Sequence, residues 1–441
     1  MSEESRPSYR IAIVGGGAAG LATAAKLLER APGRVRLDIF DRRPVPFGLI
    51  RYGVAPDHAA GRQLIEKRSA VFDDPGVRFL GAVDFNRDLQ RDDLLSSFDA
   101  VVYATGAAAD RLLDIPGESL AGVRSGRSFA EWCTGAPGVP GFDLTGVTSV
   151  AIVGLGDVAI DLARLLLKRP AEFAETDMPR DVLEHLTSHR VREVSILVRR
   201  GPGDCQLKSR DLAELLNLPD VAVRFDKAAL NVDEAHLSQK AQDALPIWRA
   251  AAEREVHGAR ARLRIRFWTR ALELRGREAL DGLRIEKTHL DKAGRLVSAG
   301  SEDMIPAQLL LRATGARGLP LDRVPFDART GTIPTVDHRV VDSTGTVQPG
   351  EYAAGWIANG WVGGFGTQNR DGAAVAERIL ADLDRHAGSI DGVLQARGVR
   401  PIGIDGWRRV EQAEQALGAA EGRERIKLSD PAELLAIARG E

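Results

Sequence analysis

IAIVGGGAAG, at residues 11–20, is an apolar run followed at once by a glycine-rich turn, and VAIVGLGDVA, at residues 150–159, repeats the pattern. A helical pattern follows the glycines in both copies, so each has the strand–turn–helix setting of a dinucleotide-binding fingerprint. Glycines allow the backbone to approach a pyrophosphate, and the start of the following helix supplies unpaired N–H groups. The chain therefore predicts two dinucleotide sites.

A second repeated motif completes each fingerprint. An apolar segment followed by Ala-Thr-Gly-Ala recurs at residues 104–107 and 313–316. Together the repeats favour an α/β fold with two Rossmann-like dinucleotide-binding domains. At the first site, the glycines expected beside the dinucleotide are Gly15, Gly17, Gly20 and Gly106.

The residue that ends the next strand distinguishes the two sites. Asp41 ends the run 37–41, at the distance from the first fingerprint where an acid accepts hydrogen bonds from a ribose 2′-hydroxyl. Its carboxylate would repel a 2′-phosphate, so this site suits FAD or NAD. The run 194–198 ends instead in Arg199 and Arg200, whose guanidiniums can clamp a 2′-phosphate. A solvated basic strand end is the alternative, but we favour FAD in the first site and NADPH in the second.

Composition bounds the class of protein. The chain has 441 residues, 44% hydrophobic and 28% charged, with a formal net charge of −2, which argues against a globally basic nucleic-acid binder. No apolar stretch approaches the roughly 20 residues of a membrane span, and residues 2–10 form no signal-peptide core. We expect no membrane span, no nucleic-acid partner and a cytoplasmic location.

Cys133 and Cys205 are the only cysteines in the sequence, and they form no closely spaced pair. A flavin-coupled disulfide reductase needs a redox dithiol, and an iron–sulfur cluster or zinc site needs several thiolates or histidines. The sequence therefore excludes both classes, and no metal site is expected. Electrons that leave a bound flavin must pass to an external acceptor.

The order of the elements predicts one domain nested in another. The elements read from apolar periodicity and turn residues are strands 10–14, 35–41, 99–103, 150–153, 194–198, 309–311 and 351–355, and helices 18–30, 59–72, 171–190 (broken at Pro179) and 368–386. Strands and helices alternate twice, and a C-terminal segment finishes the first domain. We predict an NADP-binding domain, 117–318, inserted into a FAD-binding domain made of residues 1–116 and 319–441.

DRRPVPFGLIRYGVAPDH, at residues 41–58, resembles the signature loop of adrenodoxin-reductase-type ferredoxin–NADP reductases. The resemblance covers nearly the whole chain, through shorter stretches at 114–118, 199–202, 325–327, 355–357, 405–407, 427–428 and Pro431. It implies FAD and NADPH as cofactors and a ferredoxin-type iron–sulfur protein as the electron acceptor.

The resemblance also implies roles for single residues. The implied FAD contacts are Ala19, Asp41, Gly48, Leu49 and Phe85, and the implied lining of the isoalloxazine ring is Trp356, Gly363, Gly364 and Phe365. The NADP positions are Gly154, Leu155, Gly156, Asp157, Val158, Arg199, Arg200 and Asp211. His58 and Glu214 resemble the polar pair that the family places near the nicotinamide, and they are the candidate catalytic residues.

The sequence departs from the family pattern in three places near the nucleotide entrance. Asp157 stands where the family usually has Asn, and its charge would repel a pyrophosphate. The usual Lys-Arg-Gly-Pro-Thr-Gly is replaced by ANGWVG at 358–363, and a usually apolar stretch is replaced by GDCQLK at 203–208. These changes bear on NADPH use more than on FAD binding.

Three hypotheses of function follow. The first is a FAD-dependent NADPH–ferredoxin oxidoreductase, which passes hydride from NADPH to FAD and single electrons to an iron–sulfur protein. The second is a FAD-dependent oxidase or monooxygenase acting on a small molecule, and the third is a nucleotide-sensing flavoprotein without catalysis. Four arginines, at 260, 262, 264 and 266, alternate along an extended run. They form either a cationic docking face for an acidic ferredoxin or a solvated basic strand.

Overall fold

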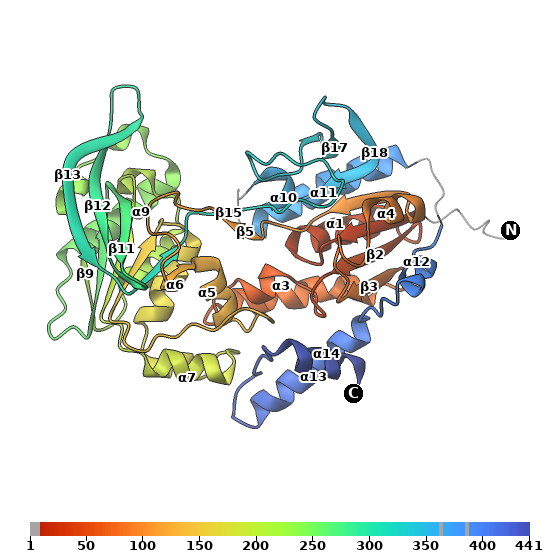
Figure 1. Ribbon diagram of the computed structural model, residues 1–441, viewed down its shortest axis with the longest axis horizontal. Helices are drawn as coiled ribbons and strands as arrows, with labels where there is room; N and C mark the ends of the chain where they lie inside the picture. Colours follow the sequence, from red (N-terminus) through yellow and green to blue (C-terminus); the bar gives the residue numbers. More distant parts are fainter. Residues whose placement is uncertain (1–8, 361–364, 384–387) are drawn as a thin grey trace. The chain divides into compact units, whose positions relative to one another are not determined.

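The chain forms two compact α/β units, which are described separately (Figure 1). The computed structural model describes residues 9–360, 365–383 and 388–441. Unit 1 comprises Met1–Ala109, Ala136–Gly138 and Ala316–Glu441, and unit 2 comprises Asp110–Gly135 and Val139–Gly315. Apart from the short stretch Ala136–Gly138, the chain passes between the units after Ala109 and after Gly315, slightly before the domain boundaries expected at 116 and 318. The expected fold class, with one α/β unit inserted in the other, is confirmed.

Unit 1 is built on a seven-stranded sheet in the order β16-β17-β18-β4-β1-β2-β3. Five strands are parallel: β1 (Tyr9–Val14), β2 (Val35–Asp41), β3 (Val77–Gly81), β4 (Ala100–Tyr103) and β18 (Val347–Ala353). The edge strands β16 (Thr335–Val336) and β17 (Arg339–Val341) are antiparallel. Both faces of the parallel strands are covered, which explains why β1 ends in the unbroken apolar run 11–14.

Helices cover the two faces of this sheet. The sheet face toward which Ile13 of β1 points is covered by α1 (Ala18–Arg30), and α1 packs against α11 (Phe365–Asp382). A Cβ at Gly372 of α11 would lie only 2.8 Å from the backbone of α1, so glycine permits the close approach. The opposite face packs against α4 (Arg91–Ser97) and α12 (Asp391–Ala396). Unit 1 also contains α2 (Leu49–Tyr52), α3 (Ala59–Ser69), α10 (Trp356–Asn359), α13 (Ile404–Ala419) and α14 (Pro431–Arg439).

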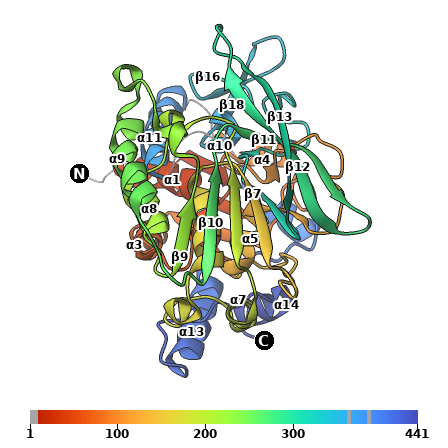
Figure 2. The same ribbon diagram turned by 90° about the vertical axis from the view of Figure 1, so that its left-hand side faces the viewer.

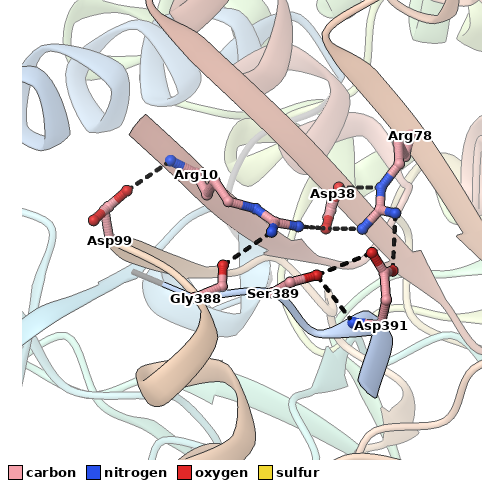
Figure 3. A network of polar contacts seen from close by, with 7 residues as sticks. All are labelled: Arg10, Asp38, Arg78, Asp99, Gly388, Ser389 and Asp391. Carbon is pink, nitrogen blue, oxygen red and sulfur yellow. Dashed lines mark hydrogen bonds and ion pairs between the residues drawn. The ribbon is translucent and has the colours of Figure 1, made fainter. Parts of the chain in front are cut away.

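A network of ion pairs joins α12 to the strands (Figure 3). The buried carboxylate of Asp38 on β2 lies 3.2 Å from Arg10 Nη2 and 2.6 Å from Arg78 Nη2. Arg78 Nη1 also lies 2.9 Å from Asp391, and Arg10 Nη1 donates to the carbonyl of Gly388 at 2.9 Å. Two cations therefore offset the desolvation of Asp38, and Gly388 and Asp391 are held against β1 and β3.

Unit 2 is built on a six-stranded parallel sheet in the order β6-β14-β7-β8-β10-β9. Figure 2 shows helices beside this sheet and a separate antiparallel sheet, β11-β12-β13, on its other side. The strands are β6 (Val123–Ser125), β7 (Ser149–Val153), β8 (Glu193–Leu197), β9 (Val221–Arg224), β10 (Ala261–Arg266), β11 (Thr269–Gly276), β12 (Leu280–Leu290), β13 (Leu296–Pro306) and β14 (Leu309–Arg312). The helices are α5 (Gly126–Cys133), α6 (Asp157–Leu167), α7 (Arg180–Ser188), α8 (Ser209–Leu216) and α9 (Gln239–Glu253).

Most predicted elements are confirmed, and one is corrected. The helix 18–30 and the strand 35–41 have the predicted bounds. The helical prediction for 171–190 is wrong over its first half, where only a 3₁₀ turn, Pro170–Phe173, precedes α7. Pro179 lacks a backbone N–H and disfavours the helical conformation in the residue before it, and α7 begins directly after it. In the described part of the chain, no helix has both the length and the apolar character needed to cross a bilayer.

Candidate functional site: two glycine turns

The first fingerprint forms the turn between β1 and α1 in unit 1. Gly15 has a φ of +116°, and a Cβ there would lie 2.4 Å from the carbonyl oxygen of Ala104. Gly20, in the first turn of α1, would place its Cβ 2.0 Å from the carbonyl oxygen of Gly15. Only glycine fits at either position. The Ala-Thr-Gly-Ala motif after β4 therefore packs against the first glycine, which explains why the two motifs occur together.

The second fingerprint repeats this arrangement between β7 and α6 in unit 2. Gly154 has a φ of +115°, and its Cβ would lie 2.3 Å from the carbonyl oxygen of Ala313, which follows β14. Ala159 takes the place of the third glycine and is fully buried. Leu155 and Val158 pack against the hydrophobic core of the unit, and these contacts fix the position of the turn.

Both turns present the start of a helix that no side chain caps. The N-cap residues are Gly17 for α1 and Gly156 for α6, and neither can accept a hydrogen bond through a side chain. The N–H groups of each first turn can therefore bind an anion such as a pyrophosphate. The two helices differ in their first residues, because α6 begins with the exposed carboxylate of Asp157.

Three segments distant in sequence meet at the start of α1. Gly48 has a φ of +49°, and a Cβ there would lie 3.1 Å from the Cα of Gly17, so α2 begins beside the fingerprint. Gly355 has a φ of +74°, and its Cβ would lie 2.6 Å from the Cβ of Ala19. Leu49 and Trp356 directly follow these glycines and are half-buried. The segments expected to surround FAD are thus brought together in unit 1.

Asp41 is already tied to the fingerprint. Its Oδ2 accepts a hydrogen bond from Gly16 N at 2.9 Å, and its Oδ1 accepts one from Arg43 N at 2.9 Å. Burial raises the pKa of Asp41, while these N–H donors and the charge of Arg43 oppose the rise. A carboxylate has about four acceptor positions, so Asp41 can also bind a ribose hydroxyl. This carboxylate, the glycine cradle and the uncapped helix fit the adenosine diphosphate half of FAD.

An aspartate that the sequence did not single out braces the turn beside Ala19. Asp371 of α11 accepts hydrogen bonds from Gly355 N and, at 3.1 Å, from Asn359 Nδ2, so it holds both ends of α10. His338 Nδ1 lies 3.7 Å from the same carboxylate. No signal in the sequence distinguishes Asp371 from a solvated acid on a helix surface.

Two other predicted FAD residues, Phe85 and Gly106, lie beside β4. Phe85 is buried, and its ring meets that of Tyr103 edge to face, with the centroids 6.0 Å apart. Gly106 lies in the loop after β4 with a φ of +73°. Gly363 and Gly364 lie outside the described residues, and Phe365 is described only as the first residue of α11.

The basic pair of unit 2, Arg199 and Arg200, lies at the carboxyl ends of the parallel strands, as the second fingerprint does. Arg199 and Arg200 follow β8, which pairs in parallel with β7, so both strands end beside Gly154. Both arginines are exposed, and Arg200 Nη1 lies 3.0 Å from Asp204 Oδ1. Asp211 lies in the first turn of α8 and is half-buried.

Comparisons with known proteins agree with this geometry. Residues 9–200 match the family described as pyridine nucleotide-disulphide oxidoreductase. The chain is 34% identical to NADPH-ferredoxin reductase FprA of Mycobacterium tuberculosis (strain CDC 1551 / Oshkosh) over 462 residues, which cover 99% of this chain and 100% of the relative. It is 33% identical to the mitochondrial NADPH:adrenodoxin oxidoreductase of Homo sapiens over 467 aligned positions. The alignment covers 99% of this chain and 93% of the human protein.

A solved structure gives the same result. Mycobacterium tuberculosis FprA in complex with NADPH matches with a TM-score of 0.91 at 34% identity, covering 99% of this chain and 100% of that one. This chain belongs to the adrenodoxin-reductase-type ferredoxin–NADP reductase family. The resemblance carried by residues 41–58 is therefore confirmed. Although the wider family is described as disulphide oxidoreductases, Cys133 and Cys205 are buried and form no disulfide, and burial raises the pKa of Cys205.

The two candidate catalytic residues of this family member lie in different units. His58 is half-buried at the start of α3 in unit 1. Glu214 of α8 lies in unit 2, where its two oxygens contact Arg164 Nη1 at 3.2 Å and Lys168 Nζ at 3.1 Å. Glu214 thus links α8 to α6 through a buried guanidinium. A role for either residue near the nicotinamide remains a prediction.

Proposed function

We propose that this chain is a FAD-dependent NADPH–ferredoxin oxidoreductase, with FAD at the first glycine turn and NADPH at the second. The observation that carries the proposal is the pair of turns, alike in backbone but followed by Asp41 in unit 1 and by Arg199 and Arg200 in unit 2. Relatives named NADPH-ferredoxin reductase and NADPH:adrenodoxin oxidoreductase, at 34% and 33% identity over nearly the full chain, support it. When bound, FAD would supply the conversion of a two-electron hydride into single electrons.

The chain's own residues would bind and orient the cofactors. In unit 1, Asp41 and the start of α1 would hold the adenosine diphosphate part of FAD, and Asp371 would fix the turn that carries Trp356. In unit 2, Arg199 and Arg200 would bind the 2′-phosphate of NADPH. We further propose that residues 117–318 form the NADP domain within a FAD domain of 1–116 and 319–441, that His58 and Glu214 act near the nicotinamide, and that the protein is cytoplasmic.

Rapid mixing of the purified yellow protein with NADPH tests the proposal. We expect fast bleaching of the flavin, followed by cytochrome c reduction that depends on added ferredoxin. Oxygen uptake without ferredoxin, stimulated by a small molecule, would favour the oxidase or monooxygenase. An absence of bleaching would favour the nucleotide sensor.

The nucleotide assignment has its own test in steady-state kinetics. Changing both Arg199 and Arg200 to Ala should raise the KM for NADPH strongly and leave that for NADH nearly unchanged, because each charge-assisted hydrogen bond contributes about 1.5–3 kcal/mol. Asp157→Asn should improve both nucleotides, since both contain the pyrophosphate. Equal use of NADH and NADPH by the unaltered protein would show that the arginine clamp does not form.

A further inference from the structure

We propose that Asp204 is a specificity-determining residue of the second nucleotide site, where it competes with the 2′-phosphate of NADPH for Arg200. The inference rests on the proposed function, because it assumes that Arg199 and Arg200 receive the 2′-phosphate. It adds that the two arginines are not equivalent, and that a carboxylate of this chain lowers the preference for NADPH over NADH.

The geometry separates the two arginines. Arg200 Nη1 lies 3.0 Å from Asp204 Oδ1, with 51% of the arginine and 41% of the aspartate side chain exposed. Arg199 is exposed and has no ion pair within the described ranges. One guanidinium is therefore open to a ligand, and the other already holds an anionic partner at the distance that a phosphate oxygen would take.

The position of Asp204 is fixed by the short 3₁₀ turn Pro202–Asp204. Asp204 N donates to the carbonyl of Gly201 at 3.2 Å, and Cys205 N donates to that of Pro202 at 3.1 Å. Gly201 lies against Trp268, where a Cβ would be 2.7 Å from the ring, and the Cys205 side chain is buried. The turn is anchored on both sides, so the backbone holds the carboxylate close to Arg200.

Charge decides what this arrangement favours. Two guanidiniums match a dianionic phosphate, but Asp204 reduces the local charge from +2 to +1 and repels the phosphate directly. NADH carries a 2′-hydroxyl instead, and a carboxylate near the end of the second strand can accept a hydrogen bond from it. Asp204 should thus weaken the binding of a 2′-phosphate and leave a 2′-hydroxyl unaffected or better bound.

Calorimetry on the FAD-loaded protein provides the test, with 2′,5′-ADP and 5′-ADP as probes. We expect Asp204→Asn to tighten 2′,5′-ADP by about three- to tenfold, as for one exposed unit charge removed from beside a phosphate. The binding of 5′-ADP should be unchanged or weaker. In the presence of Arg200→Ala, the same substitution should have a smaller effect, because the competition for Arg200 is gone and only the direct repulsion of the phosphate remains.

Asp220→Asn is a matched control. Asp220 pairs with exposed Arg169 and has 37% of its side chain exposed, but it precedes β9 and so lies at the amino ends of the parallel strands, whereas Arg200 lies at their carboxyl ends. It should leave both affinities unchanged. The proposal is overturned if Asp204→Asn leaves 2′,5′-ADP affinity unchanged, or if Asp220→Asn changes it equally. Failure of NADPH to bleach the flavin while Asp204→Asn still tightens 2′,5′-ADP would count against the proposed reductase function alone.

Discussion

Asp41 and Arg200 lie at the ends of strands that occupy the same place in the two units, and each already has a polar partner within its own unit. Asp41 ends β2, beside β1, and accepts a hydrogen bond from Gly16 N. Arg200 follows β8, beside β7, and pairs with Asp204. Since the glycine turns themselves are alike, we expect the charge at this position to separate a site for a ribose 2′-hydroxyl, as in FAD, from a site for the 2′-phosphate of NADPH.

Asp41→Ala should weaken FAD binding. The change removes the acceptor for a ribose hydroxyl and also frees Gly16 N, so we expect a loss of about 1–3 kcal/mol. FAD dissociation followed by flavin fluorescence would measure it. Asp74→Ala is the control, because Asp74 also accepts a glycine N–H, from Gly76 at 2.8 Å, but lies before β3. Equal loss of FAD in both variants would contradict the assignment.

Single residues also mark the limit of what the sequence predicts. Gly15, Gly20 and Gly154 were predictable because a tight turn against a neighbouring strand admits no side chain. Asp371 was not, because its partner Gly355 lies 16 positions away, and only the fold brings the two together. Asp204 sits four positions after Arg200, but that spacing indicates an ion pair only once the turn between them is known.

Among the elements, those bounded by glycine turns were predicted best. α1 and β2 follow from periodicity and the fingerprint itself, since their apolar faces are continuous. The antiparallel sheet β11-β12-β13 was missed, and its strand β13 gives little sequence signal, because it is exposed along most of its length and has no apolar alternation. β13 adopts a strand conformation because it pairs with β12, and hydrophobic periodicity within the β13 sequence cannot reveal such a pairing.

The C-terminal helices hold α2 next to the proposed FAD turn. Arg51 Nη2 of α2 lies 2.5 Å from Glu414 Oε1 of α13, and both side chains are fully buried. The Arg51 guanidinium also lies 4.8 Å from the ring centre of Trp407, and Lys427 Nζ donates to the carbonyl of Arg51 at 3.1 Å. Residues near the C-terminus thus fix a segment near the N-terminus.

Glu414→Gln should destabilise unit 1. It leaves the buried Arg51 without its counter-charge, and breaking a buried ion pair costs about 3–5 kcal/mol. We expect FAD to be released at a lower temperature, as flavin fluorescence would show. Glu411→Gln is the matched control on the same helix, because Glu411 pairs with Arg425 at 3.5 Å while partly exposed. Similar release temperatures for the two variants would refute the expectation.

His189, which directly follows α7, should make unit 2 sensitive to acid. Burial, together with the charges of Arg260 and Arg192, lowers its pKa to about 4. Between the ordinary pKa of about 6.5 and this value, the unfolded chain binds a proton that the folded chain does not, so stability falls as the pH falls. With partial exposure discounted, this loss is about 1–2 kcal/mol.

His189→Asn should remove this part of the pH dependence. Asn can still accept the hydrogen bond from Val191 N that the ring Nδ1 accepts at 3.1 Å. Denaturant unfolding at about pH 7 and about pH 4.5 would compare the two proteins. An equal loss of stability in both would mean that the proton binds elsewhere.

For the whole molecule, the net charge of −2 hides local basic stretches. On β10, Arg262 and Arg264 share Glu193, at 3.1 Å and 2.9 Å, and just before it Arg260 donates to the carbonyl of Leu167 at 2.5 Å. One carboxylate among these arginines leaves the stretch positive. The stretch is therefore either a ferredoxin-docking face or a solvated basic strand.

Ionic strength separates the two interpretations. If β10 docks an acidic ferredoxin, ferredoxin-dependent turnover should fall as salt rises from about 0.01 M to about 0.15 M, where charges are screened beyond roughly 8 Å. Changing Arg262 and Arg264 to Gln should reduce this salt response. Turnover with a neutral quinone serves as the control in both proteins. Salt responses that are the same with ferredoxin and quinone would exclude docking through these charges.

The insertion of unit 2 has a consequence for biosynthesis. β4 and β18 are neighbours in one sheet, with Glu351 opposite Val101, yet the whole of unit 2 is translated between them. During synthesis, the edge of β4 that pairs with β18 stays unpaired until β18 leaves the ribosome. Unit 2, by contrast, can already form its sheet from its own strands. We expect nascent chains stalled once residue 315 has left the ribosome, but before β18 has emerged, to protect unit 2 from protease and leave β1 to β4 cleavable. A half-made sheet of this kind is where chaperones would be needed.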